Sequence, residues 1–173
     1  MAETPRFTRP QDVWELMTRE ERRQAAEAFW QGGGPDEQAR AELLLAERLK
    51  FRPRSVHAMP LARKSEYLTA LVLPYVPEVL ERALVSYHLQ ERHELLGAFL
   101  DALNIPHERG EIKSEGPIAP PTPEALQAAH AAVAGRFPAH DVQVYFATLL
   151  VADPGTWQGL AELLASDAGS PAG

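Results

Sequence analysis

The amino-acid sequence predicts an all-α fold, a single irregular helical bundle of about eight helices. Apolar residues recur at spacings of three and four through most of the chain, as they do along one face of an amphipathic helix. Helix-start signals stand at Thr18, Pro77 and Thr122. Only residues 142–146 (VQVYF) alternate as a strand would, and their longer window fits a helix.

The stretch from Pro77 to Leu103 forms the centre of the predicted bundle. Its apolar residues fall into two sets with helical spacing: Val79, Leu80, Ala83, Leu84 and Tyr87, then Leu95, Leu96, Phe99, Leu100 and Leu103. Polar residues 90–92 separate the sets and predict two helices, or one helix that bends near Gln90. We expect a buried core of Leu84, Leu96, Phe99, Leu100 and Leu103, with Leu126, Phe146 and Trp157 packed around it.

The N-terminal part of the chain predicts a short helix from Gln11 to Met17 and a longer one that follows it. Thr18 and Glu21 have the spacing of a capping box, in which each side chain satisfies a backbone N–H of the first turn. The glycines at 32–34 end this helix. A phosphate-binding loop is the less favoured interpretation of these glycines, because no strand precedes them, no Lys-Ser/Thr pair follows and the GxGxxG spacing is missing.

Two further helices are predicted before Pro77. The first begins at Pro35 and runs to about Lys50, with acidic residues in its first turn, where the helix dipole favours them. Residues 52–60 contain two prolines and are expected to be a connector. The second helix runs from Leu61 to about Leu73, where Pro74 interrupts it.

The longest irregular segment is a proline-rich crossover loop, residues 104–122. It lacks an apolar stripe, so we expect it to cross the surface and to be the most protease-sensitive internal site, unless it forms an ordered flap. Thr122 and Pro123 begin the next predicted helix. Residues 141–152 are ambiguous between strand and helix, and helix is preferred. A last helix follows Asp153.

Length and composition indicate one soluble, cytoplasmic domain. The 173 residues, 45% hydrophobic and 24% charged, predict a helical domain over residues 10–165 between a flexible N-terminus (1–9) and a flexible C-terminal tail (166–173). No apolar run is long enough to span a membrane, and no secretion leader is evident. The absence of cysteine excludes disulfides, thiolate catalysis and cysteine-ligated metals. A net charge of −7 argues against indiscriminate nucleic-acid binding.

The six histidines do not form a recognisable metal or catalytic motif. The sequence HELLG at His93 begins like a zinc-protease helix but has Gly97 where the second histidine should stand. His88 and His130 lie beside apolar stripes, which favours buried core histidines and leaves open a polar pocket that also includes His107. No serine lies in a nucleophile elbow. The sequence thus predicts no catalytic residue, no metal ligand and no cofactor.

One segment has a net charge opposite in sign to that of the whole chain. Residues 48–64 hold six basic residues and no acidic one. The candidate anion-binding residues in this segment are Lys50, Arg52, Arg54, His57, Arg63 and Lys64. The alternative, which is favoured, is that these side chains pair with acidic residues of neighbouring helices and complete the fold.

The function predicted from these observations is a non-enzymatic module for protein interaction or self-association. An anion or nucleic-acid binder that uses residues 48–64 is the alternative. An enzyme with a histidine and carboxylate site between helices is a third possibility, involving His88, His130 or residues 104–122. The expected partner is a protein or a second copy of the chain; a nucleic-acid partner is disfavoured but left open, and no membrane is expected.

Overall fold

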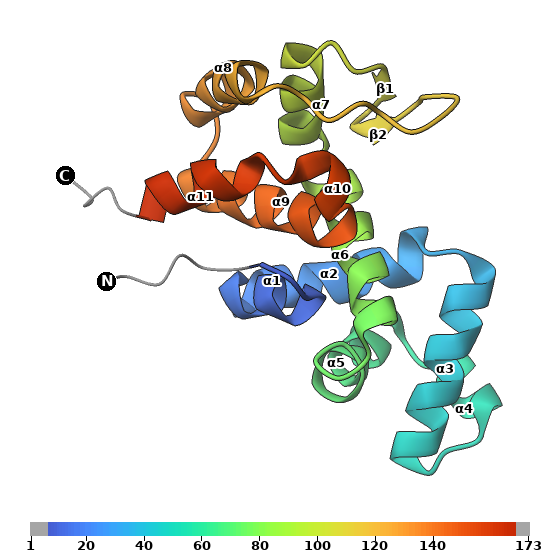
Figure 1. Ribbon diagram of the computed structural model, residues 1–173. Coiled ribbons are helices and arrows are strands. Elements are labelled where there is room, and N and C mark those ends of the chain that lie inside the picture. The colour runs from blue at the N-terminus through green and yellow to red at the C-terminus, as the bar shows by residue number, and fades with distance from the viewer. Residues whose placement is uncertain (1–6, 169–173) are drawn as a thin grey trace. The chain divides into compact units, whose positions relative to one another are not determined.

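The computed structural model describes residues 7–168, which fold into eleven helices and one short β-hairpin, so the all-α prediction is confirmed (Figure 1). The elements are α1 (Pro10–Leu16), α2 (Arg19–Gly32), α3 (Pro35–Leu49), α4 (Pro53–His57), α5 (Leu61–Leu71), α6 (Pro77–Glu91), α7 (His93–Ala102), β1 (His107–Glu108), β2 (Glu111–Ile112), α8 (Pro123–Ala134), α9 (Ala139–Ala152), α10 (Pro154–Trp157) and α11 (Leu160–Ala168). Internal contacts group the chain into two compact units. Residues 14–91 form the α2–α6 unit, and the described residues 7–13 and 92–168 belong to the α7–α11 unit.

The α2–α6 unit begins with the predicted capping box. The Glu21 backbone N–H donates to Thr18 Oγ1 at 3.2 Å, and the Thr18 backbone N–H donates to Glu21 Oε2 at 2.7 Å. Two amide groups that a helix start leaves without a partner are therefore satisfied. Because both residues lie within four positions of each other, sequence alone was sufficient to predict this contact.

The glycines after α2 have a structural role. Gln38 Nε2 donates to the carbonyl oxygens of Trp30 at 2.8 Å and Gly33 at 2.9 Å, which closes the end of α2. A Cβ on Gly33 would lie 2.6 Å from the Phe29 carbonyl oxygen, and a Cβ on Gly32 would overlap the Gln90 side-chain amide. Gly33 needs to be glycine because a backbone oxygen approaches it closely, whereas at Gly32 the flexible Gln90 side chain could move aside.

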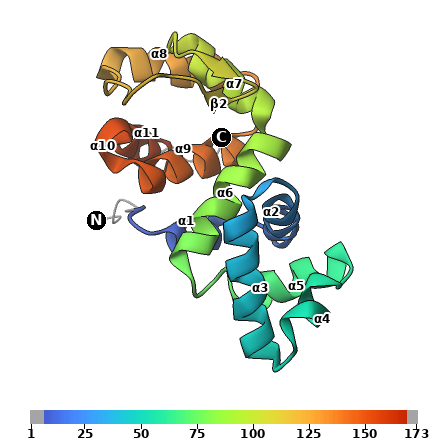
Figure 2. The same ribbon diagram turned by 90° about the vertical axis from the view of Figure 1, so that its right-hand side faces the viewer.

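The core of the α2–α6 unit forms where α2 packs against α5 and α6, and α3 packs against α4 and α5 (Figure 2). Its largest fully buried side chains are Phe29, Leu45, Leu68, Leu73, Leu80, Leu84 and Tyr87. The connector expected at 52–60 contains the short helix α4, whose first residue is Pro53. Proline is well tolerated there because the first helical N–H has no intrahelical acceptor.

The break between the two central helices lies at Arg92, two residues beyond the expected bend near Gln90. There α6 ends at Glu91 and α7 begins at His93. Arg92 has φ −129° and ψ 22°, which is outside the α-helical region.

The core of the α7–α11 unit surrounds Phe99. The Phe99 ring centroid lies 4.9 Å from Phe146, 5.6 Å from Tyr145 and 5.9 Å from Trp157. In this unit α7 packs against α8, and α9 packs against α8, α10 and α11. The predicted burial is confirmed here for Leu96, Phe99, Leu100, Leu126, Phe146 and Trp157. Leu84 is also buried as predicted, but in the core of the α2–α6 unit. Leu103 is only half-buried, since α7 ends at Ala102 and Leu103 follows its last turn.

The loop at 104–122 is more ordered than its sequence suggests, because β1 and β2 pair in an antiparallel hairpin within it. The turn residues Arg109 (φ 50°) and Gly110 (φ 87°) both have positive φ, as a two-residue hairpin turn requires. A Cβ on Gly110 would lie 2.6 Å from Leu96 Cβ, so glycine also lets the turn approach α7. The remainder, residues 113–122, is irregular.

Helices α8 to α11 can be compared with the remaining predictions for the C-terminal part of the chain. Residues 142–151 lie inside α9, so the preference for helix over strand is confirmed. The predicted caps of α8 and α10 are present, with Ala125 N–H donating to Thr122 Oγ1 and Thr156 N–H donating to Asp153 Oδ1, both at 3.2 Å. Helix α11 extends to Ala168, so residues 166–168 of the expected tail are helical.

Residues 7–9 of the expected flexible N-terminus are described, and the Thr8 and Arg9 backbone N–H groups both donate to Asp12 Oδ2 at 2.9 Å. Residues 1–6 and 169–173 of the expected flexible segments lie outside the described residues. The prediction of one domain over residues 10–165 stays a prediction. Between residues 7 and 168, no helix has both the length and the hydropathy needed to cross a lipid bilayer.

Candidate functional site

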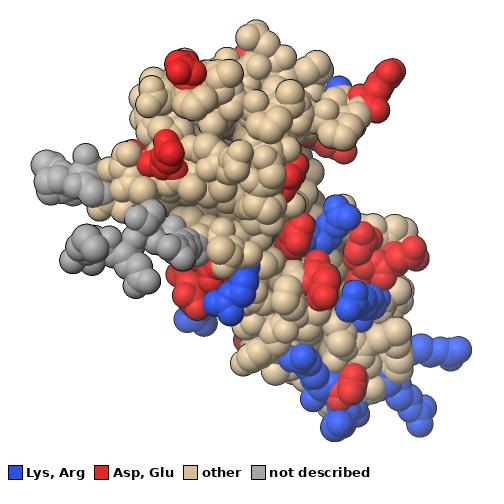
Figure 3. All heavy atoms as spheres, viewed as in Figure 1, with Lys and Arg blue, Asp and Glu red and all other residues tan. Residues whose placement is uncertain are grey.

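The basic segment at 48–64 lies on one end of the α2–α6 unit. It comprises the C-terminal end of α3, all of α4 and the first turn of α5, and lysine and arginine side chains project there in Figure 3. Helix α3 packs against both α4 and α5, which brings these three elements together. The structure divides the six predicted anion-binding residues into two groups.

The first group, His57 and Lys64, contacts the carboxylate of Glu42 on α3. Lys64 Nζ lies 3.2 Å from Glu42 Oε1, and His57 Nδ1 lies 3.0 Å from the same oxygen. Lys64 Nζ also lies 4.4 Å from the centroid of the Trp30 ring, a cation–π contact. The Lys64 side chain is only 12% exposed. For Lys64, the structure therefore agrees with the favoured interpretation, in which basic residues pair with neighbouring helices.

The second group consists of Lys50, Arg52, Arg54 and Arg63, all of which are exposed. Within the described part of the chain, none of their side chains forms an ion pair with a carboxylate. Arg63 Nη2 instead donates to Tyr67 Oη at 3.4 Å, and this hydrogen bond raises the pKa of Arg63. Four exposed cations thus form no ion pair with a described carboxylate, although Glu66 also contributes to the raised pKa of Arg63. For these four residues the structure does not show the pairing that the sequence favours.

Large apolar side chains are exposed on the same helices. Leu43 on α3 is 59% exposed, Phe51 after α3 is 43% exposed, and Leu61 at the start of α5 is 38% exposed. Phe51 stands between Lys50 and Arg52 in the chain. We call this set of residues the α3–α5 surface: Leu43, Lys50, Phe51, Arg52, Arg54, Leu61 and Arg63.

The backbone at the end of α3 shapes this surface. Lys50 is the C-cap residue and has a left-handed conformation, with φ 58° and ψ 35°. Its backbone N–H donates to the carbonyl oxygens of Ala46 and Glu47. Phe51 N–H donates to the Ala46 carbonyl oxygen at 2.9 Å, so the turn that presents the Phe51 ring is held by the helix end.

The α2–α6 unit also has a concavity of about 690 Å³ between α2 and α5. Its lining includes Arg23, Glu20 and Glu27 from α2, and Arg23 forms ion pairs with both glutamates. Thr69, Ala62 and Ala70 line it from α5. Arg19 from α2 and Glu66 from α5 complete the charged lining, so the concavity holds charges of both signs and not a group of cations like that at 48–64.

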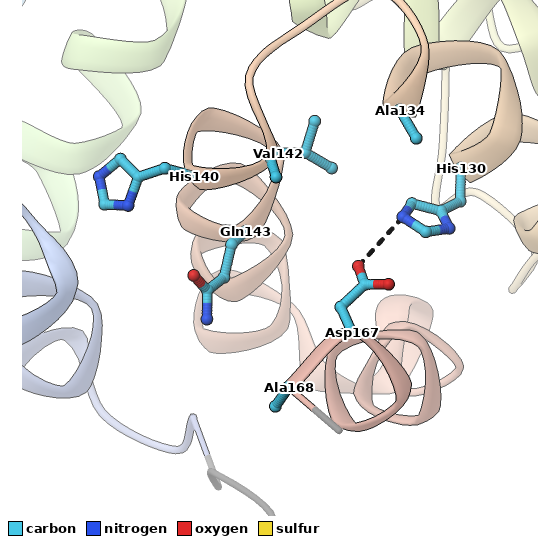
Figure 4. Close-up of a pocket in the computed structure, with 8 residues that line it drawn as sticks. His130, Ala134, His140, Val142, Gln143, Asp167 and Ala168 are labelled. Atoms are coloured by element: carbon cyan, nitrogen blue, oxygen red, sulfur yellow. Dashed lines mark ion pairs between the residues drawn. The ribbon is translucent and has the colours of Figure 1, made fainter. Parts of the chain in front are cut away.

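The α7–α11 unit contains a cavity of about 430 Å³ between α8, α9 and α11 (Figure 4). His130 on α8 and Asp167 on α11 point toward one another, and His130 Nε2 lies 3.1 Å from Asp167 Oδ2. Gln143 and His140 on α9 line the opposite side, and the His140 ring points away from His130. Val142 and three alanines supply the apolar part of the lining.

This cavity contains an imidazole–carboxylate pair, His130 and Asp167. A carboxylate beside an imidazole also occurs next to activated nucleophiles in enzymes. None of the eight lining residues carries a hydroxyl, thiol or amine. The described lining therefore contains the pair and an amide that can hydrogen-bond a ligand, but no side-chain nucleophile.

The other two histidines of the predicted polar pocket do not line this cavity. His107 Nδ1 accepts a hydrogen bond from Gly110 N–H at 3.1 Å, and its Nε2 lies 3.0 Å from Asp101 Oδ1. A Cβ on Gly97 would lie 3.2 Å from His107 Cε1, so the glycine of the HELLG sequence leaves room for this imidazole. His88 belongs to the other unit, is 2% exposed and contacts the Tyr87 ring.

Sequence reasoning missed three polar residues of the cavity: His140, Gln143 and Asp167. His140 and Gln143 lie on α9 and Asp167 lies on α11, whereas His130 lies on α8. Asp167 also belongs to the segment that was expected to be the C-terminal tail. No local pattern joins positions so far apart, because their proximity depends on how α8, α9 and α11 pack.

Among residues 7–168, no three His, Asp or Glu side chains gather closely enough to hold a metal ion.

No protein-family model matches the chain, and no curated protein or solved structure shows significant similarity to it.

Proposed function

We propose that this protein is a non-enzymatic interaction module whose α3–α5 surface binds an acidic, partly apolar segment of a partner protein. The observation that carries the proposal is that α3, α4, α5 and the residues joining them hold four exposed cations without an ion pair in the described chain and three exposed large apolar side chains. Acidic residues of a partner complement the cations, and its apolar residues cover Leu43, Phe51 and Leu61.

The two kinds of side chain have different roles in this binding. Burial of apolar surface contributes about 25 cal/mol per Å², which favours a partner that covers the Phe51 ring. Arginine and aromatic residues are also the types that contribute most at protein interfaces. The cations supply electrostatic complementarity, which accelerates association and selects acidic partners.

A polyanion such as single-stranded nucleic acid is the competing ligand for the same cations. Phe51 offers a stacking platform between Lys50 and Arg52, as single-strand binders use. Leu43 and Leu61 favour a protein partner instead, because exposed aliphatic side chains do not stack on bases and have no role in phosphate contact. A second copy of this chain is another acidic partner, since residues 92–173 hold ten acidic and four basic residues.

The proposal is tested by fluorescence anisotropy with a labelled peptide of alternating glutamate and leucine. The variant K50Q/R52Q/R54Q removes three cations of the surface. The control R109Q/K113Q/R136Q removes three exposed cations of the α7–α11 unit and has the same net charge. We expect Kd to rise about tenfold for the first variant, since three exposed charge contacts of about 0.5 kcal/mol each are lost. The control should stay within about twofold, because its cations lie outside the surface.

Two results contradict the proposal. One is that K50Q/R52Q/R54Q binds the peptide as tightly as the native chain. The other is that a labelled single-stranded oligonucleotide binds more tightly than the peptide at the same salt, with an affinity that falls steeply as salt rises. Sedimentation of the protein alone separates self-association from binding to another protein.

A further inference from the structure

The segment that joins β2 to α8 contains two overlapping proline pairs with the spacing P-x-x-P. Pro117 and Pro120 form the first pair, and Pro120 and Pro123 form the second. In a polyproline II helix, residues three apart lie on the same face because the helix has three residues per turn. The spacing therefore places Pro117, Pro120 and Pro123 in one row if the segment adopts that conformation.

The covalent structure of the segment favours this conformation at nearly every position. Proline fixes φ near −65°, and a residue that precedes proline is restricted to extended conformations. Ala119, Pro120 and Thr122 each precede a proline. Thr122 has φ −68° and ψ 156°, close to the polyproline II values of about −75° and 145°. All described peptide bonds are trans.

The exposure of the segment repeats with the same period of three. Pro117, Pro120 and Pro123 are exposed, whereas Ile118 and Pro121 are half-buried. Ile118 and Pro121 thus face the protein and hold the segment against it, while the proline row faces solvent. In the described chain, residues 117–121 make no backbone hydrogen bond, as is usual for polyproline II.

We propose that residues 117–122, which are followed by Pro123 in the first position of α8, are a recognition segment for a partner domain with an aromatic-lined groove that binds polyproline II ligands. Such grooves receive prolines spaced three apart and gain affinity because the ligand conformation is already formed. The flanking Glu115 and Glu124 are exposed and favour a groove with a basic rim. The nearby Lys113 is compensated, since its Nζ lies 2.9 Å from Glu111 Oε2.

This proposal is independent of the proposed function. It concerns the α7–α11 unit, whereas the α3–α5 surface belongs to the α2–α6 unit. The two ligands also differ in chemistry, because one is acidic and the other is an aromatic groove.

The experiment is an isothermal titration of the full chain with a panel of purified SH3, WW and profilin domains. The variant P117A/P120A removes two prolines of the exposed row. The control P106A/P138A removes two other exposed prolines, so it matches the general effect of losing proline. We expect at least one domain to bind, P117A/P120A to weaken that binding by about tenfold or more, and the control to change it less than about twofold.

The proposal is overturned if no domain of the panel binds the full chain, or if P117A/P120A binds as the native chain does. Melting temperatures of both variants show whether they are folded. As a second measurement, backbone NMR shifts and couplings of residues 117–122 report their conformation directly. Values typical of polyproline II support the proposal, and values averaged over several conformations contradict it.

Discussion

At the scale of single residues, neighbouring basic side chains of one segment have different roles. Lys64 contacts a carboxylate and an indole, and its side chain is largely buried. Arg54 is exposed and has no carboxylate partner in the described chain. Charge and spacing in the sequence do not distinguish the two, because the distinction depends on which helix faces each side chain.

The replacement Lys64→Gln is expected to lower the free energy of unfolding by about 1–2 kcal/mol, since it removes the Glu42 ion pair and the contact with Trp30. The matched replacement Arg54→Gln should change it by less than about 0.5 kcal/mol. Urea denaturation measures both values. Equal losses for the two variants would mean that Lys64 does not stabilise the fold through these contacts.

Phe99 gives a second comparison at this scale. Phe99→Ala is expected to cost about 3–5 kcal/mol, because the ring is completely buried among Tyr145, Phe146 and Trp157. The exposed Leu43 serves as the control, and Leu43→Ala should cost less than about 0.5 kcal/mol. A loss below about 1 kcal/mol for Phe99→Ala would show that the ring is not central to the core.

At the scale of elements, local signals were sufficient to predict most helix boundaries. The caps at Thr18, Thr122 and Asp153 depend on residues three positions apart, so the sequence contains the whole interaction. The hairpin at 107–112 was missed because its strands are only two residues long and too short to show alternation. The turn at Arg109 and Gly110 was the one available signal for it.

Residues 104–122 are still expected to contain the most protease-sensitive internal site. We expect trypsin to cut first, among internal sites, after Lys113, because this exposed residue stands where the hairpin ends and the irregular segment begins. Mass spectrometry of the early fragments identifies the site. Earlier cleavage after Arg136, which follows α8 and serves as an internal comparison, would indicate that residues 113–122 are held more tightly than their exposure suggests.

At the scale of the whole molecule, composition and periodicity predicted the all-α class correctly, because amphipathic spacing runs through the entire chain. The candidate surface was predicted only in part. The basic segment was visible in the sequence, but the exposure of Leu43, Phe51 and Leu61 was not. Leu43 in particular has helical spacing relative to the buried Ala46, yet it is 59% exposed.

The central claim is that the α3–α5 surface binds an acidic and apolar protein segment. NMR titration of isotope-labelled full-length protein with the glutamate and leucine peptide tests this claim most directly. We expect the chemical shifts of Lys50, Phe51, Arg52 and Leu61 to change as peptide is added and to reach a plateau. The shifts of His130 and the other residues that line the cavity in Figure 4 should change little. Shift changes confined to the cavity, or no changes at high peptide concentration, would contradict it.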